Sequence, residues 1–429
     1  MSNLPELLDP QMLTAGFTAT KLIAYPSTWI NRRVETIELL SHEETRRRVS
    51  VDFTLSDELA RGLATAEGIV VPISVLTKEA RRNFDLRDES GAAVPVLGRH
   101  SNAELAQIAV TNAAVDALPE SVTPDAFELV AGDLGQIVTS SPRSAEDALG
   151  VLVGGAEYGN ELRAAIWTDE TCRILLQTLS TNYVLFAVLP PGGPHRRILK
   201  YSYGDDFEGV GTAGTLRERL DPGWLGIRAA YPDRSRFFIL CPGANRAASF
   251  HAEIAIPEEL RIETAALYDM AGEHPVGNTD ENVNRASLYA RHALDGDSDI
   301  NIFVEVAPER GGRPIQAAAA GVAVTFLLWL GVASGLQTDN PGPAVSLLLA
   351  GAALYSGAFA VRGKHVLVRR LFSASRRWLS VVASTALVAS ATLAMEFPEA
   401  HPVCVWWLAA IACTLASLRL VWSAIRAPS

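Results

Sequence analysis

Cysteine is scarce in this sequence of 429 residues, and its four cysteines, Cys172, Cys241, Cys404 and Cys413, are scattered. No two of them form a C-x-x-C pair, so the sequence provides neither a disulfide framework nor the ligand spacing of a zinc site. Free thiols in a large domain favour a reducing compartment. We therefore predict no metal and no cofactor, and expect the larger part of the chain to lie in the cytoplasm.

Catalytic motifs are also missing, since neither G-x-S-x-G nor H-E-x-x-H occurs anywhere in the chain. His251 and Glu253 lie on the outward face of a predicted strand and could act as a base and its orienting carboxylate. No motif supplies a nucleophile beside them, so solvated strand residues are the favoured interpretation. The sequence favours a non-enzymatic protein over an enzyme.

Positive charge is depleted from the first three quarters of the chain. Residues 1–313 carry 29 basic and 45 acidic side chains, a net charge of −16, whereas residues 314–429 carry 8 and 3, a net of +5; together these give the −11 of the whole chain. Nucleic-acid binding requires a basic surface, so the acidic head (residues 1–313) argues against a nucleic-acid partner.

Long uncharged stretches dominate the tail (residues 314–429). Roughly 20 apolar residues are needed to cross a bilayer. The fourth stretch reaches this length because the long side chain of Arg419 can extend to the interface. A buried helical core in a soluble domain is the alternative. The predicted transmembrane helices are 315–336, 344–361, 378–395 and 402–425.

Basic residues are concentrated in the connector between the second and third predicted spans, and the other two connectors have none. Excess Lys and Arg in short loops marks the cytoplasmic side, so both chain ends are predicted to be cytoplasmic in a multi-pass protein of the cytoplasmic membrane. Besides setting topology, this connector could contact lipid head groups or the acidic head. Its cations are Arg362, Lys364, Arg369, Arg370, Arg376 and Arg377.

Small residues recur at four-residue spacing in the predicted spans: Gly331 with Gly335, and Ala353 with Gly357. Such pairs let helices approach closely, either within one bundle or between copies of the chain. The cores of the spans contain no Asp, Glu, Lys or His. Carriers of ions and protons usually keep such groups at membrane depth, which argues against a transporter.

The head alternates between two periodicities. Residues 47–55 alternate apolar and polar side chains, as a half-buried strand does, and further short strands are predicted up to 100. Helical spacing takes over in 101–180, and strands return in 181–313. We predict an α+β protein: a cytosolic β-sandwich-like domain, in two β-rich parts (1–100 and 181–313) with a helical insert (101–180), before a four-helix transmembrane bundle (314–429). A separate α+β domain at 101–230 is the alternative.

A glycine-rich segment, Gly209 to Gly214, matches the G-x-G-x-x-G fingerprint of dinucleotide-binding loops at Gly209, Gly211 and Gly214. The preceding acids, Asp205, Asp206 and Glu208, would repel a pyrophosphate, and Pro222 leaves room for a short helix at most. A flexible connector is the favoured interpretation. The acidic run 295–299 resembles the start of a calcium loop but lacks its later ligands, which favours a polar turn.

These patterns predict an integral membrane protein whose cytosolic head binds a protein or a small ligand. Its tail would anchor the chain in membrane lipids, associate between copies, or gate in response. Sensors and membrane effectors share this architecture. Two alternatives remain: a membrane-bound enzyme that uses a nucleotide at the glycine-rich segment, and a passive envelope scaffold.

Overall fold

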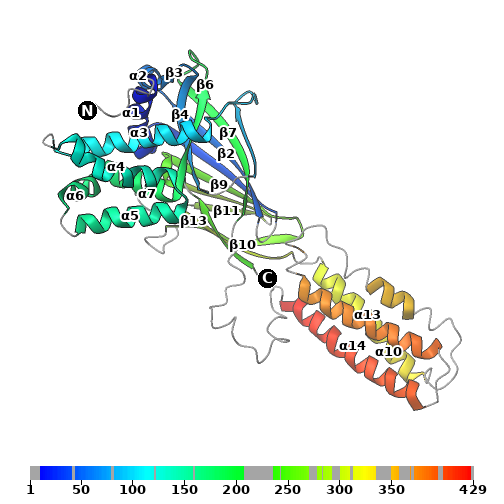
Figure 1. The fold of residues 1–429 in the computed structure, drawn as a ribbon. Coiled ribbons are helices and arrows are strands. Elements are labelled where there is room, and N and C mark those ends of the chain that lie inside the picture. Colours follow the sequence, from blue (N-terminus) through cyan, green and yellow to red (C-terminus); the bar gives the residue numbers. More distant parts are fainter. Residues whose placement is uncertain are drawn as a thin grey trace.

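A computed structural model describes most of the chain as a head of sheets and helices, followed by a bundle of long helices (Figure 1). The head is a mixed α+β structure with three β-sheets. The described residues are 10–40, 44–78, 82–119, 122–157, 160–206, 235–241, 243–269, 278–282, 284–291, 300–309, 313–334, 349–356, 368, 372–394 and 400–426.

The largest sheet has seven strands and joins distant parts of the sequence. β1 and β2 pair as an antiparallel hairpin, whereas β1 and β9 pair in parallel. The predicted alternation of β2 is confirmed, because Val49, Val51 and Phe53 are buried. The strands, in spatial order, are β11 (Asn278–Asn282), β12 (Arg285–Arg291), β9 (Ser249–Ala255), β1 (Ile30–Leu39), β2 (Glu44–Thr54), β7 (Arg196–Asp206) and β5 (Arg82–Asp88).

Two smaller sheets of three strands complete the β-structure. One contains β3 (Ala64–Thr65), β4 (Gly68–Thr77) and β6 (Asn182–Leu189); the other contains β10 (Leu260–Asp269), β13 (Ile300–Pro308) and β8 (Ser235–Cys241). The apolar run of β6 suggests a central strand, but β6 lies at the end of its sheet. The chain before α3 covers this edge, since Leu97 N donates to Phe186 O and Val188 N donates to Pro95 O.

Helices pack on one side of the long strands (Figure 1). The predicted insert is a block of five helices that extends from Arg99 to Thr181, and the N-terminal helix α1 was not predicted. The helices of the head are α1 (Pro10–Ala24), α2 (Asp57–Gly62), α3 (Arg99–Ala117), α4 (Pro124–Thr139), α5 (Pro142–Glu157), α6 (Glu161–Thr168) and α7 (Glu170–Thr181), with short 3-10 turns η1 (Pro26–Thr28) and η3 (Ala244–Arg246).

The head has two hydrophobic cores. The first lies among α1, the helical block, the β4–β6 sheet and one half of the seven-stranded sheet. The second joins the other half of that sheet, from Ile37 and Leu39 of β1 to β9 and β12, to the sheet of β8, β10 and β13. Val368 and Phe372, which belong to the basic connector of the tail, are buried in the second core.

The tail contains three long helices, α10 (Arg313–Ala333), α13 (Ser373–Ala394) and α14 (Ala400–Arg426), and a helical segment at 349–356. Two parts, Ile315–Ala333 and Val403–Ile425, are long and apolar enough to cross a membrane. The helix α13 is long enough but less apolar, because it carries arginines in its first turns and several hydroxyl side chains. The second predicted span is described only at 349–356, so the structure supports two of the four predicted spans on this criterion.

Candidate functional site

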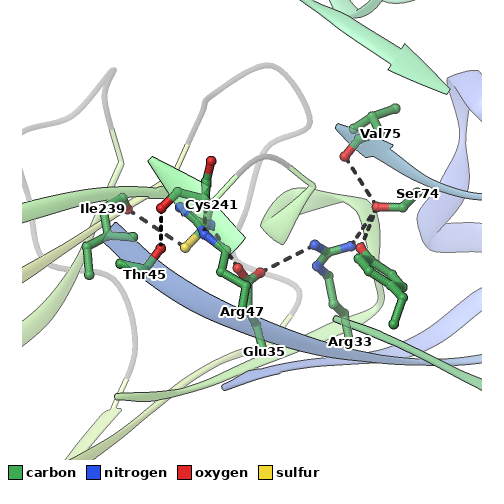
Figure 2. Close-up of polar contacts among 10 residues, drawn as sticks. Arg33, Glu35, Thr45, Arg47, Ser74, Val75, Ile239 and Cys241 are labelled. Atoms are coloured by element: carbon green, nitrogen blue, oxygen red, sulfur yellow. Dashed lines mark hydrogen bonds and ion pairs between the residues drawn. The ribbon is translucent and has the colours of Figure 1, made fainter. Parts of the chain in front are cut away.

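A network of buried charges lies inside the head, where the two cores meet (Figure 2). Arg33 and Glu35 alternate on β1, so they point to the same face of the sheet, and Arg47 of β2 lies beside them. Arg33 Nη2 lies 3.3 Å from Glu35 Oε2, and Arg47 Nη1 donates to Glu35 Oε1 at 2.8 Å. All three side chains are almost completely excluded from solvent. One carboxylate therefore holds two guanidinium groups in the interior.

Hydroxyl groups and a second carboxylate extend this network across the sheets. Arg33 Nη1 donates to Ser74 Oγ of β4 at 3.2 Å, and Ser74 Oγ lies 2.6 Å from the hydroxyl of Tyr201 on β7. At the other end, Arg47 Nε lies 3.1 Å from Asp205 Oδ2. The network thus connects β1, β2, β4 and β7, and it separates the apolar residues of the first core from those of the second.

Burial alone would lower the pKa of Arg33 and Arg47, since it removes water from their charges. Interactions with the tyrosine neighbours and with Glu35 outweigh this effect, so the pKa of each guanidinium lies above its ordinary value. The thiol of Cys241 is buried nearby, and burial raises its pKa. A protonated thiol is a poor nucleophile, so this network has the chemistry of a structural element rather than a catalytic centre.

A pocket of about 650 Å³ lies on the helical side of the head. Its walls come from the first turns of α3, the connection between α4 and α5, and strand β6. Its size falls in the range of small-molecule sites, roughly 300–1,000 Å³. The ring of Phe84 lines this pocket and also stacks on Tyr201 with centroids 6.1 Å apart, so the pocket adjoins the charge network.

Lys78 is the half-buried cation of this pocket. It follows the last residue of β4, and its backbone N donates to Thr181 O at 3.0 Å, which fixes its position. Its Nζ donates to Ile137 O in the last turn of α4 at 2.6 Å. Burial lowers the pKa of Lys78 to about 8, so its ammonium group loses its proton at a lower pH than that of an exposed lysine.

The glycine-rich segment with Gly209, Gly211 and Gly214 lies outside the described residues, and so does the acidic run at 295–299. His251 Nε2 lies 3.9 Å from Glu253 Oε1 on β9, where the imidazole also packs edge-on against Tyr289. Among the described residues, no group of histidine, cysteine or acidic side chains has the arrangement of a metal site.

The predicted basic connector is described in part. Arg376 and Arg377 lie in the first turns of α13, whereas Arg362, Lys364, Arg369 and Arg370 lie outside the described residues. Among the predicted packing residues, Gly331 lies against the buried ring of Trp406 on α14, and Ala353 is buried in the bundle. Gly335 and Gly357 lie outside the described residues.

Neither the charge network nor the pocket was predicted from the sequence. The sequence does contain one indication of the network. Arg47 falls on the same alternating positions of β2 as the buried residues Val49, Val51 and Phe53, where an apolar side chain is expected. No such signal marks Lys78, because its pocket is assembled from elements that are far apart in the sequence.

Comparison with known proteins supplies no family for this chain. No protein-family model matches it, and no curated protein matches it either.

Proposed function

We propose that this chain is a membrane-anchored sensor or effector whose head binds a ligand or partner in the cytoplasm and whose tail responds. The single observation that carries the proposal is the exposed apolar surface of α10 and α14. Only 33% and 39% of their candidate spans is buried. The core helix of a soluble protein would be mostly buried, so these surfaces are suited to lipid.

Individual side chains support this assignment. Phe326 and Leu330 on α10 and Leu408 and Leu415 on α14 are each more than half exposed, although they are large and apolar. In water, such a surface would favour aggregation, whereas in a bilayer it contacts acyl chains. The opposite faces of these helices pack together, with Leu328, Trp406 and Ala410 fully buried between them.

The finer topology, with four spans and both chain ends in the cytoplasm, is supported by the described charges and contacts. Arg376 and Arg377 stand at the start of α13, as expected for residues on the cytoplasmic side. Val368 and Phe372 pack into the head, which would keep this connector on the same side of the membrane as the head. An even number of spans would then return the C-terminus to that side.

The pocket favours recognition of a small ligand by the head, and the connector offers a route by which the head could influence the tail. The tail could anchor the chain, associate with other copies, or open a path through the membrane. The nucleotide-dependent enzyme and the passive scaffold remain the alternatives, and no observation on the described residues favours either.

Reporter fusions to the full chain test the sidedness. A fluorescent protein that matures in the cytoplasm should fluoresce when it is fused after Ser429, and a phosphatase that is active only outside the cytoplasm should be inactive there. The same phosphatase inserted in the connectors 337–343 and 396–401 should be active. Phosphatase activity after Ser429 would overturn the proposed orientation.

Dye entry tests the response of the tail. Overexpression of the full chain should admit a membrane-impermeant dye if the tail gates, and the variant without residues 314–429 should not. If the dye does not enter the cells at any expression level, although the reporters confirm the orientation, the tail serves only as the membrane anchor of a sensor. If the full chain is soluble without detergent, both the gating tail and the anchoring tail are contradicted.

A further inference from the structure

The walls of the pocket are mainly carbon. Side chains of α3, β6 and the segment before α3 form an apolar lining, including Val96, Ala106 and Leu185. The amide of Asn102 at the base of α3 is satisfied by the protein itself, because it donates to Val184 O and accepts from Phe186 N. A ligand that fills this space needs an apolar body.

The polar groups of the pocket are positive or neutral. Lys78 and Arg99 contribute cations, and the other polar side chains in the described lining are hydroxyls and an amide, with no carboxylate. This composition contrasts with the net charge of −16 on residues 1–313. The starts of α3 and α5 border the pocket, and so do the last turns of α4 and α7, so helix ends of both signs meet here and the positive charge of the lining comes from Lys78 and Arg99.

The ammonium group of Lys78 retains donors for a ligand. It has three N–H donors, and its bond to Ile137 O uses one of them. Within the described part of the chain no carboxylate pairs with it, since the lowering of its pKa is due to burial. A half-buried cation attracts an anion more strongly than a fully exposed one, because water screens its charge less.

We infer that this pocket binds an amphipathic carboxylate, with its carboxylate at Lys78 and its apolar chain against α3 and β6. The ligand class is therefore that of a medium-chain fatty acid or a similar apolar acid. This inference rests on the proposed role of the head as the ligand-binding part, and it names the chemistry of the ligand. It does not depend on the orientation of the chain in the membrane.

Binding of isotopically labelled octanoate to the full chain, held in amphipathic polymer without free micelles, tests the inference by equilibrium dialysis. Octanoate should bind saturably with one site per chain. Lys78→Met should weaken binding by about tenfold or more, since it removes a charge-assisted hydrogen bond. Lys78→Arg retains the charge and should weaken it less. Lys200→Met, at an exposed lysine of β7, is the matched control and should leave binding unchanged.

Two further measurements distinguish binding of octanoate in the pocket from its partition into the apolar surface of the tail. Octanol has the same chain without the charge and should bind at least about tenfold more weakly. Ala103→Phe, which adds a ring to the lining without altering a charge, should block octanoate. If octanol binds as well as octanoate, or if Lys78→Met and Ala103→Phe both bind octanoate like the unaltered chain, the inference is wrong.

The pH dependence supplies an independent readout. Binding of octanoate should weaken between pH 7 and 9, as Lys78 loses its proton, whereas the Lys78→Arg variant should bind equally across this range. Arg99 and Tyr183 also face the pocket, and they are unchanged in both proteins. Equal pH profiles would overturn the role of Lys78. If octanoate does not bind as described while the reporter fusions confirm the orientation, the ligand class is rejected and the membrane proposal stands.

Discussion

At the scale of single residues, Glu35 holds two arginines in place. Its carboxylate oxygens accept one guanidinium each, from Arg33 and Arg47, in a site closed to solvent. Glu35→Gln would leave two buried charges without their counter-ion. Removing one partner of a buried pair costs about 3–5 kcal/mol of the free energy of unfolding. We expect the midpoint of thermal unfolding to fall by about 10 °C, measured by circular dichroism.

Glu38→Gln is the matched control, since it makes the same substitution on the same strand. Glu38 lies 3.5 Å from Arg48, but both side chains are largely exposed, and such pairs contribute about 1 kcal/mol or less. Its midpoint should stay within about 2 °C of the unaltered chain. Equal effects of the two substitutions would show that the buried network does not stabilise the head.

Lys78 makes the stability of the head depend on pH. Burial lowers its pKa to about 8 in the folded chain, whereas an unfolded lysine titrates near ~10.4. Between these values the unfolded chain binds more protons, so the free energy of unfolding should increase as pH rises from 8 to 10. Thermal midpoints of the unaltered chain and Lys78→Met at pH 7 and pH 9.5 measure this. If the difference between the thermal midpoints of the two proteins is the same at pH 7 and pH 9.5, the prediction is contradicted.

At the scale of elements, the contact between α10 and α14 depends on a glycine. A Cβ atom at Gly331 would lie 2.3 Å from Cζ3 of Trp406, which is fully buried, so the helices would have to separate. We expect Gly331→Ala to destabilise the bundle by about 1–3 kcal/mol, as overpacking does. The midpoint of heat-induced unfolding in detergent measures the effect.

Gly351→Ala is the control for this substitution. Position 351 lies in the helical segment 349–356, and a Cβ there would meet nothing within 4 Å. Alanine favours a helix over glycine by about 1 kcal/mol, so this variant should be as stable as the unaltered chain or more stable. If both variants lose stability equally, the close approach of α10 to α14 is not the cause.

Local patterns predicted many elements because periodicity depends on neighbouring residues. The strand β9 shows this, because Phe250, Ala252 and Ile254 recur at every second position and are buried on one face. The helix α4 begins at Pro124, directly after Thr123, and proline is common at the first position of a helix. The start of α3 differs from its local pattern: Ser101 and Glu104 have the spacing of a capping box, but the helix begins at Arg99 after Gly98.

Long-range pairing could not be predicted in the same way. The parallel pairing of Arg33 with Phe250 joins residues that are more than 200 positions apart, and no local pattern encodes it. The charge network depends on this kind of packing, because Ser74 of the β4–β6 sheet meets Arg33 and Tyr201 of the seven-stranded sheet only when these two sheets pack together. The pocket of Lys78 has the same origin.

At the scale of the whole molecule, the basic connector is joined to the head by apolar contacts. The sequence suggested an electrostatic contact between this connector and the acidic head, and the structure shows that Val368 and Phe372 of the connector pack into the second core. Apolar contacts of this kind resist salt, whereas an interaction between exposed charges would be screened. The connector therefore links the head directly to the helices of the tail.

Phe372→Ala tests this link. Phe372 is buried against the core of β8, β10 and β13, and truncation of a buried phenylalanine costs about 3–5 kcal/mol. We expect backbone amides of β10 and β13 in the full chain to exchange hydrogen at least about tenfold faster. Phe326→Ala is the matched control, because Phe326 is 65% exposed on α10 and its loss should leave exchange in the head unchanged. If Phe372→Ala also leaves exchange unchanged, the connector does not support the head, and any coupling between head and tail would have to run through β13 and α10, which are adjacent in the sequence.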